Sequence, residues 1–550
     1  MIKINNFHLL ILTILFTLFN SCKDLDELNI NPNAPDPQVA DLNLLMPTII
    51  TGIGQTVVGL GFGDIAGVMQ HTQKDGWSSN HNNYDWDNQS HDWSNYYGIL
   101  RNIDEFYNKA IEGEYEFHKG VGLVMKAYTF GLITDLWGDA PHNDALKAEK
   151  GPEFFKPAYD YQRDIYLSIL NDLENANTFL SKPSSAYTNI SSTQDILYQG
   201  NVAKWRKLAN SLALRYYMRL SEKEREIAKQ GIAKIASDVN KYPLITQASD
   251  DAKVGYIGSS PSDSWPSTME FNPDPRGAYM RVKMCATLVK ILQELNDPRL
   301  GVWANKIEIP LVLVSGEKID RIVNGRREIS QDVVDEFEKA FNVKIDFDPQ
   351  YVGLPPSLFA PQAYNLNPTK EQGGYNPHCS HLNEMYKKSS GPLLQMRLMS
   401  AAEVHFILAE AALYEWIPGN PEEHYAEGIC QSFNAWGVTS EFENYIHGVP
   451  YFGLESIIQQ KWIASWTAAA ESWFDWRRTG FPKLKTGEAA VREALPLRFY
   501  YHYDNEIAKN TTNANAAIER LEPTQYKGSD VSNNSAWSKM WVLQGTGKPY

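Results

Sequence analysis

The sequence predicts a mainly α protein: one large helical body that carries a loop-rich insertion with short β segments. Three observations predict this fold class. Several segments of about 20 residues place apolar side chains three and four residues apart, as on the buried face of a helix. Glycine and proline punctuate residues 240–395 instead, with short β-rich pieces among them. The hydrophobic fraction of 43% is enough for a sizeable core.

The chain starts with a short apolar stretch that predicts a signal peptide over residues 1–21. Lys3 supplies one positive charge, the uncharged run FHLLILTILFTLF follows at Phe7–Phe19, and the small Ser21 precedes Cys22. A helix needs about 20 apolar residues to span a bilayer, so this run is too short to be a permanent anchor. No similar run follows, and the mature chain is predicted to lack a transmembrane helix.

Cys22 is predicted to be the lipidated first residue of the mature protein. The residues before it resemble a lipobox, with Phe19 at the usual aliphatic position and Asn20 in place of a smaller residue. The acidic KDLDE that follows looks like the tag that exports some Gram-negative lipoproteins to the outer cell surface. An ordinary signal peptide with an incidental cysteine is the alternative. Acyl chains on Cys22 would anchor the protein firmly when two or more are attached.

Residues 22–40 are predicted to form a lipidated tether, and residues 41–550 the body. The tether contains NINPNAPDPQV, whose asparagine, proline and aspartate residues resist helix and sheet. Because these residues favour an extended chain, the body would hang from the anchor at Cys22.

The first part of the body is predicted to form four long helices. They cover residues 96–112, 119–138, 160–180 and 200–221. The second is apolar all round, which predicts a buried helix. The short joins favour stacked antiparallel pairs, and Trp205-x-x-Leu208 resembles the start of a tetratricopeptide repeat.

Helices return after the insertion and end in an irregular tail rich in tryptophan and asparagine. They are predicted in residues 398–416, 422–437 and 454–478. Within the insertion, the segments 306–314 and 318–325 read as short β pieces. Loops carried on a rigid scaffold are common binding sites, so the insertion is a candidate ligand face.

Composition excludes several classes of partner and site. The formal charge of −15 leaves no basic face for nucleic acid. With Cys22 lipidated, Cys285, Cys379 and Cys430 form at most one disulfide, and buried packing is their simplest role. No C-x-x-C pair indicates zinc.

Motif-like stretches do not support a nucleotide site or a catalytic site. GLGFGD at 59–64 lacks the strand-turn-helix frame of a dinucleotide site, and GTGK near the end lacks the residues of a P-loop. DWDNQSHDW at 85–93 starts like a calcium loop but has Ser90 where glycine belongs. No cofactor is predicted, and a looser calcium site stays an alternative without a motif.

An aromatic, polar loop is the strongest site candidate. In KDGWSSNHNNYDWDNQSHDWSNYY, aromatic rings alternate with amide, carboxylate and hydroxyl side chains and follow no helical period. Such rings stack on the C–H face of a sugar while polar groups take its hydroxyls. The alternatives are a protein interface and internal packing. Together with two aromatics of the insertion, the candidate ligand contacts are Trp77, Tyr84, Trp86, Trp93, Trp265 and Tyr279.

Several longer stretches resemble the SusD/RagB family of outer-membrane nutrient-binding lipoproteins, closest to its SusD-like branch. They occur in the family's order and span most of the chain: LITDLWGDAPH (132–142), NDPRL (296–300), AEVHFILAEAALYEW (402–416), IIQQKWIASWTAAAESWFDWRRTGFPKL (457–484) and LPLRFYYHYDNEIAKN (495–510).

This resemblance implies a helical body of four tetratricopeptide-like helix pairs with a loop-rich ligand face. Members of the family cap a SusC-like TonB-dependent barrel in the outer membrane, bind an oligosaccharide or a peptide, and pass it inward without catalysis. The expected protein is therefore a surface lipoprotein and not an enzyme. A purely gating lid and a surface glycosidase are the alternatives. The family's ligand face varies, so no ligand residue is carried over, and Arg477 and Arg478 are expected to cap helices and pair with acids.

Overall fold

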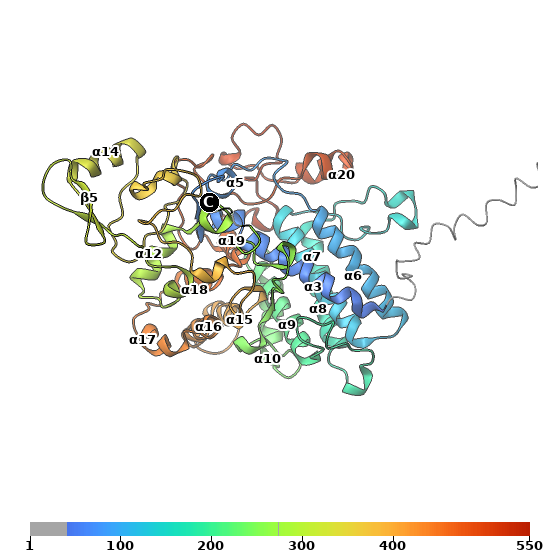
Figure 1. Ribbon diagram of the computed structural model, residues 1–550. Helices are drawn as coiled ribbons and strands as arrows, with labels where there is room; N and C mark the ends of the chain where they lie inside the picture. The colour runs from blue at the N-terminus through green and yellow to red at the C-terminus, as the bar shows by residue number, and fades with distance from the viewer. Residues whose placement is uncertain (1–40, 273, 275) are drawn as a thin grey trace, which may run out of the picture.

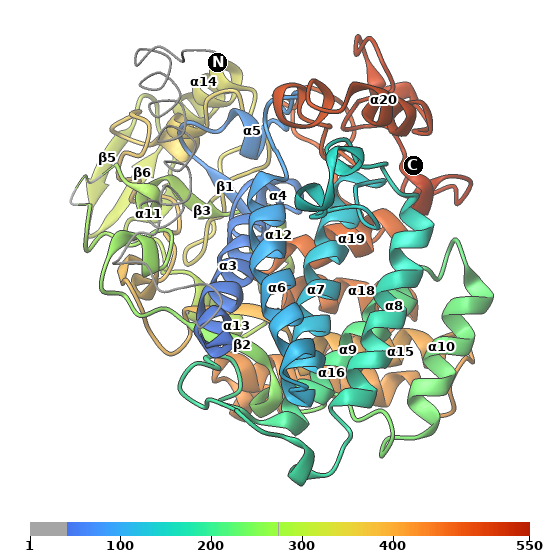
Figure 2. The same ribbon diagram turned by 90° about the vertical axis from the view of Figure 1, so that its right-hand side faces the viewer.

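The computed structural model describes residues 41–272, 274 and 276–550 of the chain. The predicted signal peptide, the tether and Cys22 lie outside the described residues. The described part is mainly helical, with the long helices packed side by side and the loops gathered toward one end (Figures 1 and 2). The predicted fold class is thus confirmed.

The N-terminal part contains eight described helices and one short strand. They are α3 (Leu45–Gly61), α4 (Asp64–Val68), β1 (Thr72–Lys74), α5 (Ser79–Asn82), α6 (Ser94–Glu112), α7 (Glu116–Trp137), α8 (Gln162–Phe179), α9 (Val202–Arg219) and α10 (Arg225–Ser237). All four helices predicted in this part are present, whereas α3 and α10 add to them.

The middle part holds the strands and the shorter helices. They are β2 (Ala252–Gly255), α11 (Ala278–Arg281), β3 (Val282–Met284), α12 (Ala286–Glu294), α13 (Arg299–Trp303), β4 (Leu311–Leu313), β5 (Asp320–Val323), β6 (Arg326–Ile329), α14 (Gln331–Phe341) and β7 (Gln395–Met399). β1 pairs antiparallel with β3, which joins the N-terminal part to the middle part. β2 pairs antiparallel with β7, which joins the start of the middle part to its end.

The C-terminal part returns to helices. They are α15 (Ala401–Leu413), α16 (Pro421–Trp436), α17 (Phe442–Ile446), α18 (Leu454–Ala464), α19 (Ala469–Thr479) and α20 (Thr511–Glu519). The predicted helix over residues 454–478 is divided in two. Its break lies at Thr467, whose φ of 69° is left-handed and cannot continue a helix.

Successive helices pack in pairs. A connection of only residues 113–115 returns the chain from α6 to α7, and α7 also packs on α8, which packs on α9 (Figure 2). In the C-terminal part α15 packs on α16 and on α18. Because it has neighbours on several sides, α7 is buried nearly all round, as its sequence predicted.

A network of buried charges joins these helices. Arg478 pairs with Glu410 of α15, and its Nη2 lies 2.9 Å from Asp475. Arg477 Nη1 donates to the carbonyl oxygens of Asp135 at 2.8 Å and Leu497 at 2.6 Å. The two arginines therefore pair with acids and satisfy backbone carbonyls, which is the structural role expected of them.

Residues Leu42–Val68 are the one described segment long and apolar enough to cross a membrane. In this structure the segment is a core element, because Met46, Ile49, Ile50 and Ile53 of α3 belong to the main hydrophobic cluster. Length and composition alone do not separate a spanning helix from such a core helix.

Residues 311–347 form an appendage with its own small core. The sheet order is β4-β6-β5, with β4 parallel and β5 antiparallel to β6, and α14 packs over it. Leu311, Ile329, Val334, Phe337 and Ile345 are buried in this separate cluster. The appendage stands out from the body at the upper left of Figure 1. It confirms the short β pieces predicted in the insertion, while β6 and α14 were not predicted.

Candidate functional site

The candidate site lies around Trp77, in the loop between β1 and α5. Trp77 has 60% of its surface exposed. Its φ of 47° is left-handed, which is uncommon for a bulky residue. The backbone N–H of Trp77 donates to Oε1 of Gln372 at 3.0 Å. A Cβ on the preceding Gly76 would come within 2.6 Å of Cβ of Gln372, so only glycine allows this close approach.

A buried ion pair holds this loop against the middle part of the chain. Asp75 Oδ2 lies 3.1 Å from Nζ of Lys283, and both side chains are almost fully buried. Asp75 Oδ1 accepts from the N–H of Gly373 at 3.1 Å. Burial raises the pKa of the Asp75 carboxyl, and Lys283 offsets this effect only in part. The pair thus fixes the loop to β3 and to the segment that carries Gln372.

A depression of about 540 Å³ opens beside Trp77. Trp77 and Arg281 line it, and the Arg281 guanidinium carbon lies 5.0 Å from the centre of the Trp77 ring. Phe271, with 40% of its surface exposed, also lines the depression, and Asn272 adds an amide. Exposed aromatic rings beside amide and guanidinium donors are suited to a sugar, whose C–H face stacks and whose hydroxyls are bound.

The other five predicted aromatics are buried, so in this structure they present little surface to a ligand. The exposed fractions are 0% for Tyr84, 4% for Trp86, 7% for Trp93, 1% for Trp265 and 1% for Tyr279. Their rings are taken up by neighbours: Trp86 packs edge-on against Trp473 and Phe499. Internal packing was one of the alternatives for these rings. Of the six, only Trp77 is largely exposed, with Arg281 over its ring, and the buried Trp265 also lines the depression.

Phe271, Asn272 and Arg281 were not predicted from the sequence. The first two lie in FNPDPRGAY, part of the region that glycine and proline punctuate. The available signal was the position of Phe271 in a segment otherwise made mostly of polar, glycine and proline residues. Arg281 carried no signal, since its place over Trp77 depends on the pairing of β1 with β3.

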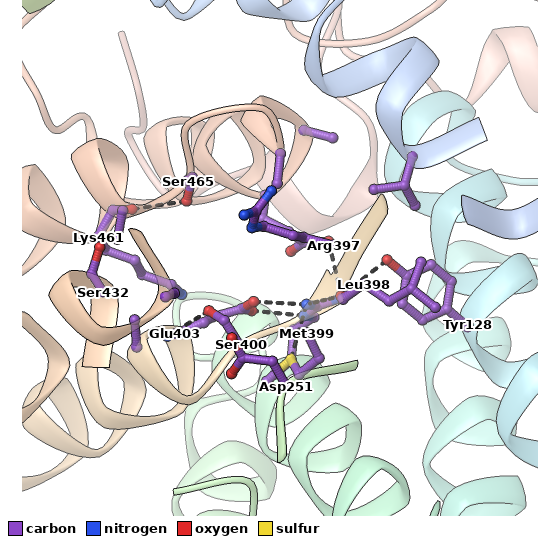
Figure 3. Close-up of a pocket in the computed structure, with 18 of the residues that line it drawn as sticks. Tyr128, Asp251, Arg397, Leu398, Met399, Ser400, Glu403, Ser432, Lys461 and Ser465 are labelled. Atoms are coloured by element: carbon purple, nitrogen blue, oxygen red, sulfur yellow. Dashed lines mark hydrogen bonds and ion pairs between the residues drawn. The ribbon is translucent and has the colours of Figure 1, made fainter. Parts of the chain in front are cut away.

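A narrow pocket between the helices is too small for such a ligand. It holds about 40 Å³, room for a few water molecules at most. Figure 3 shows Asp251, Arg397, Glu403 and Lys461 around it. Glu403 lies 2.7 Å from Arg215, and Arg397 rests on the Trp436 ring at 4.1 Å. These charges join helices and leave no space for a sugar.

Metal ligands are not gathered in the part of the chain that the structure describes. No three His, Cys, Asp or Glu side chains are arranged there to hold an ion. The DWDN segment uses its acids locally: Asp85 accepts from Ser79 Oγ at 2.6 Å, and Asp87 accepts from the N–H of Gln89 at 2.8 Å. The described thiols Cys285, Cys379 and Cys430 are free.

Comparison with known proteins identifies relatives along most of the chain. A family model described as "SusD-like, starch-binding associating with outer membrane" matches residues 37–328 and 351–502. The match leaves out residues 329–350, which include α14 of the appendage. A comparison with curated proteins gave no match.

Solved structures share the fold over nearly the whole length. A putative outer membrane protein from Bacteroides vulgatus, probably involved in nutrient binding by its title, superimposes with a TM-score of 0.70 at 24% identity, covering 92% of this chain and 100% of that one. A chitin-binding protein gives 0.68 at 22% identity, covering 91% and 98%. A chitin-binding SusD homolog from Flavobacterium johnsoniae gives 0.65 at 18%, covering 91% and 99%. At these identities the likeness shows the fold alone.

Proposed function

Because this chain belongs to the SusD-like family of outer-membrane-associated starch-binding proteins, we propose that it binds an oligosaccharide through the Trp77 depression. The single observation that carries this proposal is an exposed tryptophan ring held in place by a buried ion pair beside a second exposed ring and polar donors. Two similar structures are described as chitin-binding, which makes chito-oligosaccharides the first ligands to test. The family description makes malto-oligosaccharides the second.

In the proposed function the protein binds the saccharide and does not catalyse its hydrolysis. Hydrolysis of a glycosidic bond needs two carboxyl groups about 5 to 10 Å apart on either side of the bond. Among the described residues that line the depression, only Asp274 carries a carboxylate. A single carboxylate can accept hydrogen bonds from sugar hydroxyls, but it cannot supply both of the catalytic carboxyl groups that hydrolysis needs.

Delivery to a transporter completes the proposal. By resemblance to the family, the bound sugar would pass to a SusC-like TonB-dependent barrel, with the protein lipidated at Cys22 and facing the cell exterior. Acyl-chain labelling of the wild type, lost in Cys22→Ala, would support the anchor. Labelling that persists in the variant would contradict it.

Purified protein tests the binding step. We expect retention on a chitin or starch affinity gel, no release of sugar from either polymer, and co-purification with a SusC-like barrel when the two proteins are co-expressed. No retention across glycans, together with stable co-purification, would favour a gating lid instead. Retention of peptides but not glycans would change the ligand class, and sugar release would overturn the non-catalytic assignment.

A further inference from the structure

A second hollow lies in the C-terminal part, separate from the Trp77 depression. It holds about 520 Å³ and opens between the segment Asp85–Asn88, the turn Tyr503–Ile507 and residues 529–534. No residue lines both hollows. The proposed function above does not use it.

Tyr503 provides an aromatic platform at its rim. The side chain has 52% of its surface exposed, and the backbone N–H donates to the carbonyl oxygen of Asn88 at 3.0 Å. The neighbouring His502 N–H donates to Oε2 of the buried Glu506 at 2.7 Å. Oε1 of Glu506 accepts from the N–H of Trp93 at 3.0 Å. The backbone at Tyr503 is therefore held by hydrogen bonds, while about half of the residue stays exposed at the hollow.

Polar side chains line the same hollow as Tyr503. Asp85 and Asp87 are exposed, and Asp85 receives one bond, from Ser79, which leaves lone pairs for further donors. The hydroxyl of Tyr500 donates to Oδ2 of Asp530 at 2.7 Å, and Arg492 Nη2 lies 4.0 Å from Oδ1 of Asp530. Ring, carboxylates and guanidinium together match the C–H faces and hydroxyls of a sugar.

The charges of the side chains that line the hollow indicate which class of sugar it can bind. Among the described lining residues, three carry carboxylates and one carries a guanidinium. An anionic sugar such as a uronate would meet net repulsion there, whereas hydroxyls and N-acetyl groups would not. The hollow is suited to an uncharged saccharide.

Trp77 lines one hollow and Asp85 the other, and the backbone holds these two residues near each other. Trp77 and Ser79 are two residues apart, which is at most about 7 Å along an extended chain. The N–H of Asp85 then donates to the carbonyl oxygen of Ser79 at 3.2 Å. The walls at Trp77 and Asp85 are thus separated by the length of a few sugar units.

We propose that the Tyr503 hollow is a second binding site for an uncharged saccharide, contacted by chains too long for the Trp77 depression alone. This inference rests on the proposed function, since it extends the same ligand. It predicts that affinity rises with the length of the saccharide, and that contacts of Tyr503 and Asp85 account for this rise.

The test is calorimetric titration of the full mature chain with chitobiose, chitohexaose, maltose and maltohexaose. We expect Tyr503→Ala to weaken hexaose binding about three- to tenfold, the range for one aromatic contact, and to leave biose binding unchanged. Asp85→Asn tests the polar wall in the same way and keeps the shape of the side chain. Phe452→Ala is the control, because Phe452 is 75% exposed and lines neither hollow.

The outcomes separate this inference from the proposed function. Hexaose binding that is unchanged in Tyr503→Ala and Asp85→Asn but lost in Trp77→Ala would overturn the second site and keep the first. Equal loss in Phe452→Ala would overturn it too, by making the effect nonspecific. A wild type that binds no saccharide in the panel would overturn both proposals.

Discussion

Asp75 and Lys283 form an ion pair at 3.1 Å, with side-chain exposures of only 4% and 1%. Asp75 directly follows β1 and begins the segment that leads to Trp77, and Lys283 lies in β3 opposite Gln73. A pair buried to this extent is costly to desolvate, and removing one partner leaves a charge without compensation. Because the ion pair holds the loop that carries Trp77, it supports the candidate ligand site.

The first prediction concerns this pair. Lys283→Met keeps the aliphatic stem but strands the buried Asp75 carboxylate, so we expect a loss of about 3–5 kcal/mol in the free energy of unfolding. The double variant Asp75→Asn with Lys283→Met should recover much of that loss, because no charge is then left unpaired. Urea unfolding measures both variants. A single variant as stable as the wild type would contradict the role of the pair.

Trp77 and Trp86, which lie on either side of α5, should differ in what they contribute to the free energy of unfolding. Trp86 is 4% exposed and its ring centre lies 5.8 Å from that of Trp473, so Trp86→Ala should cost about 3–5 kcal/mol. Trp77→Ala changes a surface ring and should stay within about 0.5 kcal/mol of the wild type. Thermal melts of the two variants check this contrast. Similar melting temperatures for both would contradict the assignment of Trp86 to the core.

Acid should destabilise the protein through its buried histidines. His71 Nε2 lies 3.0 Å from the carbonyl oxygen of Trp462, and burial lowers the pKa of His71 to about 3 from 6.5. Below pH 6.5 the His71 ring therefore binds a proton in the unfolded chain but not in the folded chain. The stability that depends on the neutral ring is complete above pH 6.5 and is lost as pH falls. Burial also lowers the pKa of His81 and His381 to about 3, and that of His118 to about 4.

The measurement is unfolding free energy against pH between 6 and 5. Each such histidine contributes up to about 1.4 kcal/mol per pH unit to the slope of the unfolding free energy against pH. His71→Gln should remove the contribution of one histidine from that slope. The exposed His447 provides the control His447→Gln, which should keep the slope of the wild type. An unaltered slope in His71→Gln would show that this ring does not resist protonation.

The appendage should be removable. Pro310 and Phe347 line the same hollow, so the two chain ends are close. The buried residues of the appendage's cluster all lie within residues 311–347, with Leu366 packed on it from outside and Val343 also packed on a neighbouring cluster. Replacing residues 311–346 by a short glycine-serine linker should leave a folded body that still binds saccharide. Circular dichroism and a thermal melt check the fold. A variant that fails to fold would mean that the appendage is part of the main core.

Much of the helical body could be predicted from the sequence, because periodicity reports which side of a helix is buried. Ile99, Ile103 and Phe106 form the buried stripe of α6 as their spacing predicted. The break at Thr467 could not be predicted, since a segment with sustained apolar content carries no sign of a single left-handed residue. The small helix α14 was missed because residues 240–395 were interpreted as loop-rich as a whole.

The candidate site was predicted only in part. Trp77 was among six aromatics in polar surroundings, and composition cannot tell an exposed ring from one that packs inward. What separates them is tertiary: Trp86 meets Phe499, at 5.2 Å between ring centres, from a segment more than 400 residues away. Trp77 instead meets Arg281 and solvent. Long-range packing of this kind leaves no local pattern in the sequence.

Calorimetric titration of chitohexaose and maltohexaose into the wild type and Trp77→Ala tests the central claim most directly. Phe155→Ala, at a ring 64% exposed that does not line the depression, is the matched control. We predict that the wild type and the control bind at least one of the two sugars, and that Trp77→Ala loses binding about tenfold or more at an unchanged melting temperature. Equal affinity in Trp77→Ala and the wild type would contradict the account.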